Sequence, residues 1–112
     1  MNKKIVQFTL IISTFLFSLN AFSACNANAC SSVYIDTLYV TSGDTIYVGT
    51  SGDERLLNCG AVSDVYLTIK LSTYGGNAMY AALLTAQSLG KKAKIRTSTA
   101  AGCPVSYIVV NK

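Results

Sequence analysis

Histidine and tryptophan are absent from the 112-residue sequence, and proline occurs once. Without histidine the chain lacks Ser-His-Asp and Cys-His catalysis, histidine-ligated zinc and a histidine pH switch. The net charge of +4 is also small. Binding driven by bulk attraction to roughly 6–10 phosphates needs a dense basic patch. We therefore expect no nucleic-acid partner, no metal and no other cofactor.

The first 23 residues are typical of a secretory signal peptide. Lys3 and Lys4 give a positive start, a mostly apolar stretch follows, and Ala21 and Ser23 are small residues at the positions that precede cleavage. The stretch is too short and too polar for a membrane span, which needs about 20 apolar residues. We assign residues 1–23 to the signal and residues 24–112 to one small domain that is secreted or periplasmic.

Removing the signal changes the composition. All four phenylalanines and two of the nine cations lie within it, so seven tyrosines remain as the aromatic residues and the net charge falls to +2. With no Phe or Trp left, we expect most tyrosines to fill core volume or to cover the faces of the fold. Tyr74, in a loop before two glycines, is expected to be exposed.

Four cysteines follow the signal, and they allow three pairings. We favour Cys25–Cys30 with Cys59–Cys103. The second closes a loop of about 45 residues, for which the chain-entropy model gives about 4 kcal/mol. No Cys-x-x-Cys spacing occurs, so structural disulfides are favoured over redox or metal chemistry.

The alternative to a Cys25–Cys30 disulfide is lipidation of Cys25. Residues 22–25 resemble a bacterial lipobox, in which the cysteine would be lipidated. Phe22 is a poor match to the Leu preferred there, and lipidation would leave Cys30 unpaired in an oxidising compartment. We therefore favour the disulfide.

The pattern of apolar, β-branched and aromatic residues predicts strands over 33–40, 45–48, 65–71, 92–97 and 105–110, with a short one over 55–59. Helical spacing over 77–89 predicts one helix, with Asn77 as its cap and Gly90 after its end. A small antiparallel barrel with one α-helix packed on it satisfies this order and hides the strand edges. The fold is expected to be mainly β and disulfide-stabilised.

The charged residues indicate little about function. Lys92, Lys94 and Arg96 alternate along a strand and share one face, which is typical of a solvated strand surface and would also suit anionic ligands. Asp53 and Glu54 are adjacent in a predicted turn, where we expect a solvated tip rather than a catalytic pair. No serine or threonine lies in a recognisable nucleophile motif, so the protein is not expected to be an enzyme.

Two segments carry a likeness to a known family. Residues 80–86 in the predicted helix, followed by the run 90–95 (GKKAKI) and a later cysteine, resemble the OB-fold B subunits of bacterial AB-type toxins, especially the subtilase-cytotoxin and typhoid-toxin B subunits. The resemblance covers most of residues 30–110 and implies a single OB-like domain over 24–112. It also implies a homopentamer that binds cell-surface glycans and carries a separate toxin A subunit.

The resemblance also implies site residues. Ser31 stands where the family has a glycan-binding serine before the first long strand, and Lys94 matches a basic residue in the strand after the helix. The expected function is thus a secreted, non-enzymatic glycan-binding subunit. The alternative is a monomeric periplasmic or secreted accessory protein that binds another protein.

The helix would leave a small, weakly polar face. Ala78, Ala81, Thr85 and Ser88 lie on it. Small side chains allow close approach, so this face would suit a ring of helices in a homo-oligomer, whereas simple exposure to solvent is the alternative.

Overall fold

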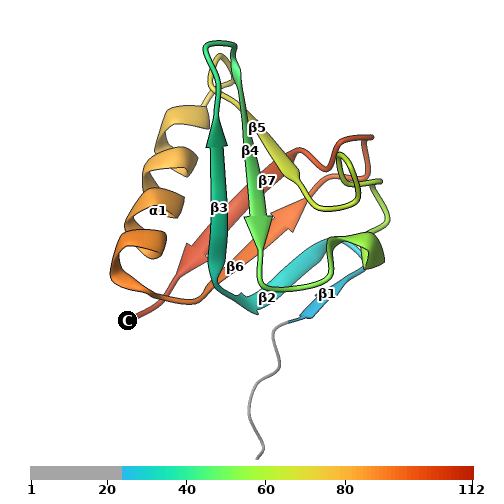
Figure 1. Cartoon of the computed structure of the whole chain (residues 1–112), viewed down its shortest axis with the longest axis horizontal. Helices are drawn as coiled ribbons and strands as arrows, with labels where there is room; N and C mark the ends of the chain where they lie inside the picture. Colours follow the sequence, from blue (N-terminus) through green and yellow to red (C-terminus); the bar gives the residue numbers. More distant parts are fainter. Residues whose placement is uncertain (1–23) are drawn as a thin grey trace, which may run out of the picture.

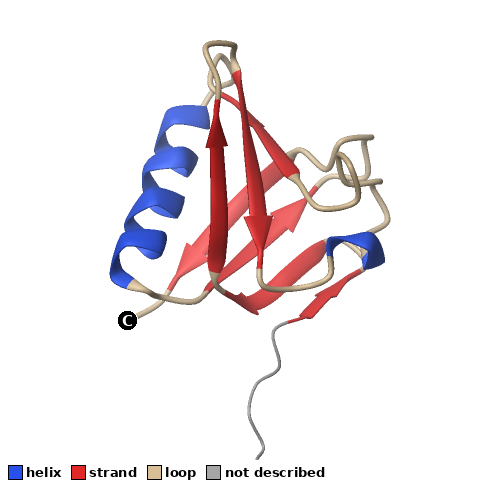
Figure 2. Ribbon diagram, in the orientation of Figure 1, coloured by secondary structure: helices blue, strands red, loops and turns tan. Residues whose placement is uncertain are grey.

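The computed structural model describes residues 24–112, so the assigned signal peptide lies outside the described residues. The described chain is mainly β, with two antiparallel sheets and one α-helix (Figures 1 and 2). It also contains two disulfides. The fold class expected from the sequence is confirmed.

Seven strands, one α-helix and one short 3₁₀ helix make up the described chain. The strands are β1 (Ala24–Asn26), β2 (Ala29–Val33), β3 (Ile35–Val40), β4 (Thr45–Thr50), β5 (Leu67–Lys70), β6 (Ala93–Thr97) and β7 (Val105–Val110). The helices are η1 (Glu54–Leu56) and α1 (Gly76–Leu89).

The two sheets join into a barrel. One sheet has the order β1-β2-β6-β7 and the other β3-β4-β5. On one side the chain passes directly from β2 into β3, with only Tyr34 between them. On the other side Thr68 and Pro104 form a parallel bridge, and the Thr68 amide donates to the Cys103 carbonyl at 3.1 Å. The ring β2/β3-β4-β5-β7-β6 is that of an OB-like barrel.

Apolar side chains from every face of the barrel meet in its interior. The strand β6 alternates strictly, with Ala93, Ile95 and Thr97 buried and the two cations between them exposed, as its sequence predicts. Leu83 and Ala86 are the fully buried α1 side chains, and Met79 and Tyr80 also pack against the core. The helix lies beside β3 in Figure 1 and also contacts β5 and β7. The fully buried larger side chains are Ile46, Leu67, Ile69, Leu83, Ile95, Val33 and Val48.

Both favoured disulfides are present. Cys25 pairs with Cys30 across the β1–β2 hairpin, with a Cα–Cα distance of 3.9 Å. Cys59 pairs with Cys103, and their Cα atoms are 4.9 Å apart. This disulfide lies next to the Thr68–Pro104 bridge. The described chain contains no free cysteine.

The sequence prediction was wrong at several element boundaries. The β1–β2 hairpin was not predicted, and the strand predicted over 33–40 is divided at Tyr34. Residues 54–56 form η1 rather than part of a strand. The helix begins at Gly76, with Gly75 as its cap in the left-handed conformation, and Asn77 does not cap it.

Candidate functional site

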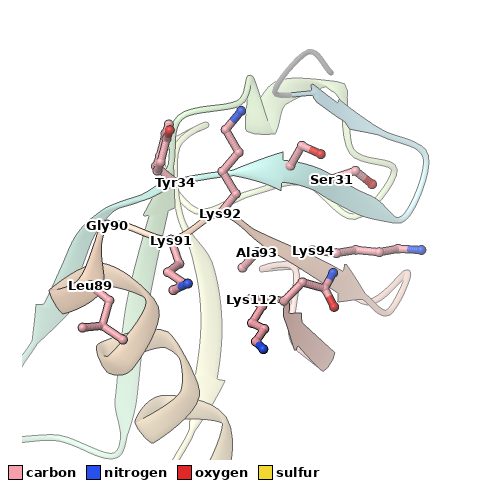
Figure 3. Close-up of a pocket in the computed structure, with 11 residues that line it drawn as sticks. Ser31, Tyr34, Leu89, Gly90, Lys91, Lys92, Ala93, Lys94 and Lys112 are labelled. Atoms are coloured by element: carbon pink, nitrogen blue, oxygen red, sulfur yellow. The ribbon is translucent and has the colours of Figure 1, made fainter. Parts of the chain in front are cut away.

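The largest concentration of cations lies at a hollow between β2, β6 and the end of α1. We call it the basic hollow. It has a volume of about 530 Å³ and is shown in Figure 3. Its lining residues are Ser31, Ser32, Tyr34, Leu89, Gly90, Lys91, Lys92, Ala93, Lys94, Asn111 and Lys112.

A β-bulge turns two consecutive serines toward this hollow. Neighbouring side chains of a regular strand point to opposite faces. In β2 the pairing with β6 shifts register between Cys30 and Val33, and Ser32 has a positive φ of 55° within the shift. Ser31 and Ser32 therefore both line the basic hollow. A bulge that re-aims side chains in this way is a frequent feature of binding sites.

The end of α1 places the lysines. Gly90 adopts φ of 65° and ends the helix, and the Lys91 amide donates to the Ala86 carbonyl at 2.8 Å. Lys91 and Lys92 follow at once, and Lys94 projects from the exposed face of β6. The negative end of the helix dipole favours cations at this position. Figure 3 shows the three side chains fanning out from this one segment.

Charge is strongly segregated around the basic hollow. Four of the seven cations in residues 24–112 line it, whereas none of the five acidic residues does. The acidic side chains Asp53, Glu54 and Asp64 line a different hollow. A net charge of only +2 over the described chain thus hides a locally positive surface that would attract anions.

Tyr34 forms one wall. Its side chain is 44% exposed, and the Lys92 ammonium nitrogen lies 5.4 Å from the centroid of its ring. This distance lies within the range of a cation–π interaction. Tyr34 therefore offers the hollow an aromatic ring with the Lys92 ammonium group over one of its faces.

The structure brings together the two glycan-binding residues expected from the sequence. Ser31 on β2 and Lys94 on β6 line the same hollow, although they are 63 positions apart in the chain. Arg96 also faces outward from β6, but it is not a lining residue. Sequence reasoning did not place Lys91, Asn111 or Lys112 at the site, because only the folded chain brings the end of β7 beside the loop after α1.

The expectation that residues 53 and 54 form a solvated tip was wrong for Glu54, which is buried. Asp53 is partly exposed and forms an ion pair with Arg55, with 2.9 Å between Asp53 Oδ2 and an Arg55 guanidinium nitrogen. Hydrogen bonds from Arg55 hold the pKa of Asp53 below its ordinary value of 3.8. Glu54, in contrast, is 5% exposed, and its Oε2 accepts from the Thr50 amide at 2.6 Å and the Thr50 hydroxyl at 2.7 Å. Its role in this structure is to hold a turn.

Among the described residues, no helix has the length and apolar character that a membrane crossing requires. The same part of the chain contains no cluster of three or more acidic or cysteine side chains placed to hold a metal ion. Comparison with known proteins finds no matching family model, no matching curated protein and no matching solved structure.

Proposed function

We propose that the protein is a secreted, non-enzymatic binding subunit that recognises cell-surface glycans through the basic hollow. One observation carries the proposal: Ser31 and Lys94, which come from different strands, line a single hollow together with three further lysines. Its volume of about 530 Å³ lies in the range of roughly 300–1,000 Å³ that is typical of small-ligand sites.

The lining favours an acidic sugar. Lysines are point charges that attract a carboxylate, and the serine hydroxyls both donate to and accept from sugar hydroxyls. The exposed Tyr34 ring adds an apolar surface for a sugar ring. A glycan that ends in a sialic acid presents all three complementary features, namely a carboxylate, hydroxyls and a ring.

Two disulfides support the proposed location. Such bonds persist in oxidising compartments and are rare in the bacterial cytosol. A secreted or periplasmic protein fits this chemistry.

A glycan array with the oxidised protein tests the binding site. We expect binding to sialylated glycans and much weaker binding after their sialic acid is removed. Lys94→Ala should weaken binding roughly 10- to 100-fold, as loss of a charge-assisted hydrogen bond does, and Ser31→Ala roughly two- to tenfold.

Two matched variants control for nonspecific effects. Arg96→Ala removes a cation from the same face of β6 outside the hollow, and Ser106→Ala removes an exposed hydroxyl from β7. Both should bind normally. Binding that survives Ser31→Ala and Lys94→Ala, or an array without any bound glycan, would contradict the proposed site.

We extend the proposal to the assembly that the resemblance implies, a homopentamer with a separate toxin A subunit. The α1 face of Ala78, Ala81, Thr85 and Ser88 is exposed, and Thr85 donates its hydroxyl to the Ala81 carbonyl at 2.9 Å. This leaves a small surface that another helix can approach. Light scattering should give about five times the mass of one chain, whereas a monomer favours the alternative of a protein-binding accessory protein.

A further inference from the structure

Three tyrosines pack together on the outside of the sheet β3-β4-β5. Tyr39 on β3 lies directly opposite Tyr47 on β4, and Tyr66 precedes β5. The ring centroids of Tyr39 and Tyr47 are 5.5 Å apart, and both lie 6.0 Å from that of Tyr66. We call these three residues the tyrosine cluster. Its spacing is that of mutually contacting aromatic rings.

Two local features surround Tyr66, namely Gly49 and the turn at residues 62–66. Gly49 lies next to the Tyr66 ring: a Cβ at this glycine would lie at an ordinary contact distance of 3.7 Å from Tyr66 Cε1, and at a tight 3.2 Å from Thr37 Cβ. A tight turn then leads into Tyr66: Ser63 and Asp64 both have positive φ, and the Val62 amide donates to the Tyr66 carbonyl at 2.9 Å. This turn thus fixes the backbone that carries Tyr66.

The cluster borders a hollow of about 240 Å³. Its lining residues are Tyr39, Thr41, Tyr47, Val62, Ser63 and Tyr66. Five of these six side chains carry a hydroxyl, and within residues 24–112 the lining has no charged group. The volume is below the roughly 300–1,000 Å³ of sites for drug-sized ligands, which suits a single ring.

The rings are available to a ligand. Tyr39 is 50% exposed, and Tyr47 and Tyr66 are half-buried. None of the three belongs to the barrel core. The surface therefore combines apolar ring faces with hydroxyls, which is what a sugar ring requires from its binding site.

We infer that the tyrosine cluster is a second carbohydrate site, which takes one neutral sugar ring. Single-stranded nucleic acid also stacks on aromatic rings, but its binding needs a positively charged groove, and the lining supplies no cation. The cluster shares no lining residue with the basic hollow. The inference does not rest on sialylated glycans binding at Ser31 and Lys94.

Saturation-transfer NMR tests the inference directly, because tyrosine and phenylalanine are the aromatic residues of the whole chain. The protein is expressed with ring-deuterated phenylalanine and exchanged into D₂O, so that irradiation of aromatic protons saturates tyrosine rings. The probes are neutral methyl glycosides of glucose, galactose and N-acetylglucosamine, with an oligothymidylate as comparison. We expect transfer to the ring protons of at least one glycoside and none to the oligonucleotide.

Variants locate the contact. Tyr39→Ala should weaken glycoside binding roughly two- to tenfold, the range expected from loss of one aromatic contact, whereas Tyr39→Phe keeps most of it. Tyr74→Ala, which removes a fully exposed ring elsewhere, and Lys94→Ala should bind these neutral probes normally. Chemical denaturation confirms that each variant folds.

Three results would overturn the inference: no transfer to any glycoside, transfer that is unchanged in Tyr39→Ala, or transfer to the oligonucleotide instead. The two proposals can fail separately. Loss of neutral-sugar binding would leave the basic hollow untouched, and loss of sialylated-glycan binding would leave the tyrosine cluster untouched.

Discussion

At the residue scale, Glu54 shows how a buried carboxylate holds the chain where β4 ends. It accepts two hydrogen bonds from Thr50, and the Thr50 hydroxyl in turn accepts from the Gly52 amide at 3.1 Å. Gly52 packs closely on the first disulfide, since a Cβ there would lie 2.8 Å from the Cys25 sulfur. One side chain therefore links the end of β4 to the β1–β2 hairpin that carries Ser31.

Replacing Glu54 by alanine should destabilise the protein markedly. The Thr50 amide and hydroxyl would lose their acceptor in a buried site, which costs about 1–3 kcal/mol for an unsatisfied group. Glu54→Gln keeps one acceptor oxygen and should lose less. Urea unfolding measures both, with Asp36→Ala as an exposed acidic control; an alanine variant of Glu54 as stable as the parent would contradict the role assigned to Glu54.

At the element scale, α1 is fixed by glycine at both ends. Gly75 and Gly90 adopt positive φ, and Gly76 is buried against the end of β5. A Cβ at Gly76 would clash with the Lys70 carbonyl oxygen and lie 3.0 Å from the Leu71 Cα. The first turn of the helix thus rests directly on the backbone of the barrel.

Gly76→Ala should therefore separate α1 from β5. We expect a loss of about 1–3 kcal/mol, as overpacking of a close contact produces, although alanine is the better helix former. Gly43→Ala lies in an exposed turn, where its Cβ would meet the Thr41 hydroxyl at an ordinary 3.5 Å, and should be nearly neutral. Equal urea midpoints for the two variants would contradict this contact.

The elements differ in how well the sequence alone predicts them. Alternation located β6, a run of β-branched and aromatic residues located β7, and Gly90 located the end of α1, because these signals are local. The beginning of α1 was missed because the contact of Gly76 with Lys70 is tertiary. Glu54 was missed for the same reason: two adjacent acids in a turn are usually solvated, and only the folded chain buries one of them.

The candidate site, too, could be predicted from the sequence only in part. The exposed side of β6 could be predicted from period two, whereas the position of Ser32 could not, because a positive φ within a strand has no local signal for serine. The approach of Lys112 to Lys91 depends on how β7 crosses the barrel.

At the scale of the whole molecule, the barrel is closed at a short seam. The strands β5 and β7 meet through the Thr68–Pro104 bridge, and the Thr68 hydroxyl also donates to the Gly102 carbonyl at 2.9 Å. Cys103 directly precedes Pro104 in the chain, so the Cys59–Cys103 disulfide links Cys59 to this seam. The Cys25–Cys30 bond closes a much shorter loop, because these two cysteines are five positions apart.

The two disulfides should differ in their contribution to stability. The chain-entropy model gives about 4 kcal/mol for the Cys59–Cys103 loop and about 2 kcal/mol for the Cys25–Cys30 loop. Cys59→Ala with Cys103→Ala should therefore lower the free energy of unfolding more than Cys25→Ala with Cys30→Ala. Urea unfolding of the two double variants provides the comparison, and the reverse order would contradict the importance of the seam.

Closure at this seam also limits the order in which the chain can fold. Of the described strands, β7 is the last to be synthesised, yet it pairs with β6 and leads directly from the bridge to β5. Until it arrives, both sheets keep open edges that can pair with other chains. Such sequence-distant pairing typically takes milliseconds to seconds, so the nascent polypeptide must remain unaggregated over that interval.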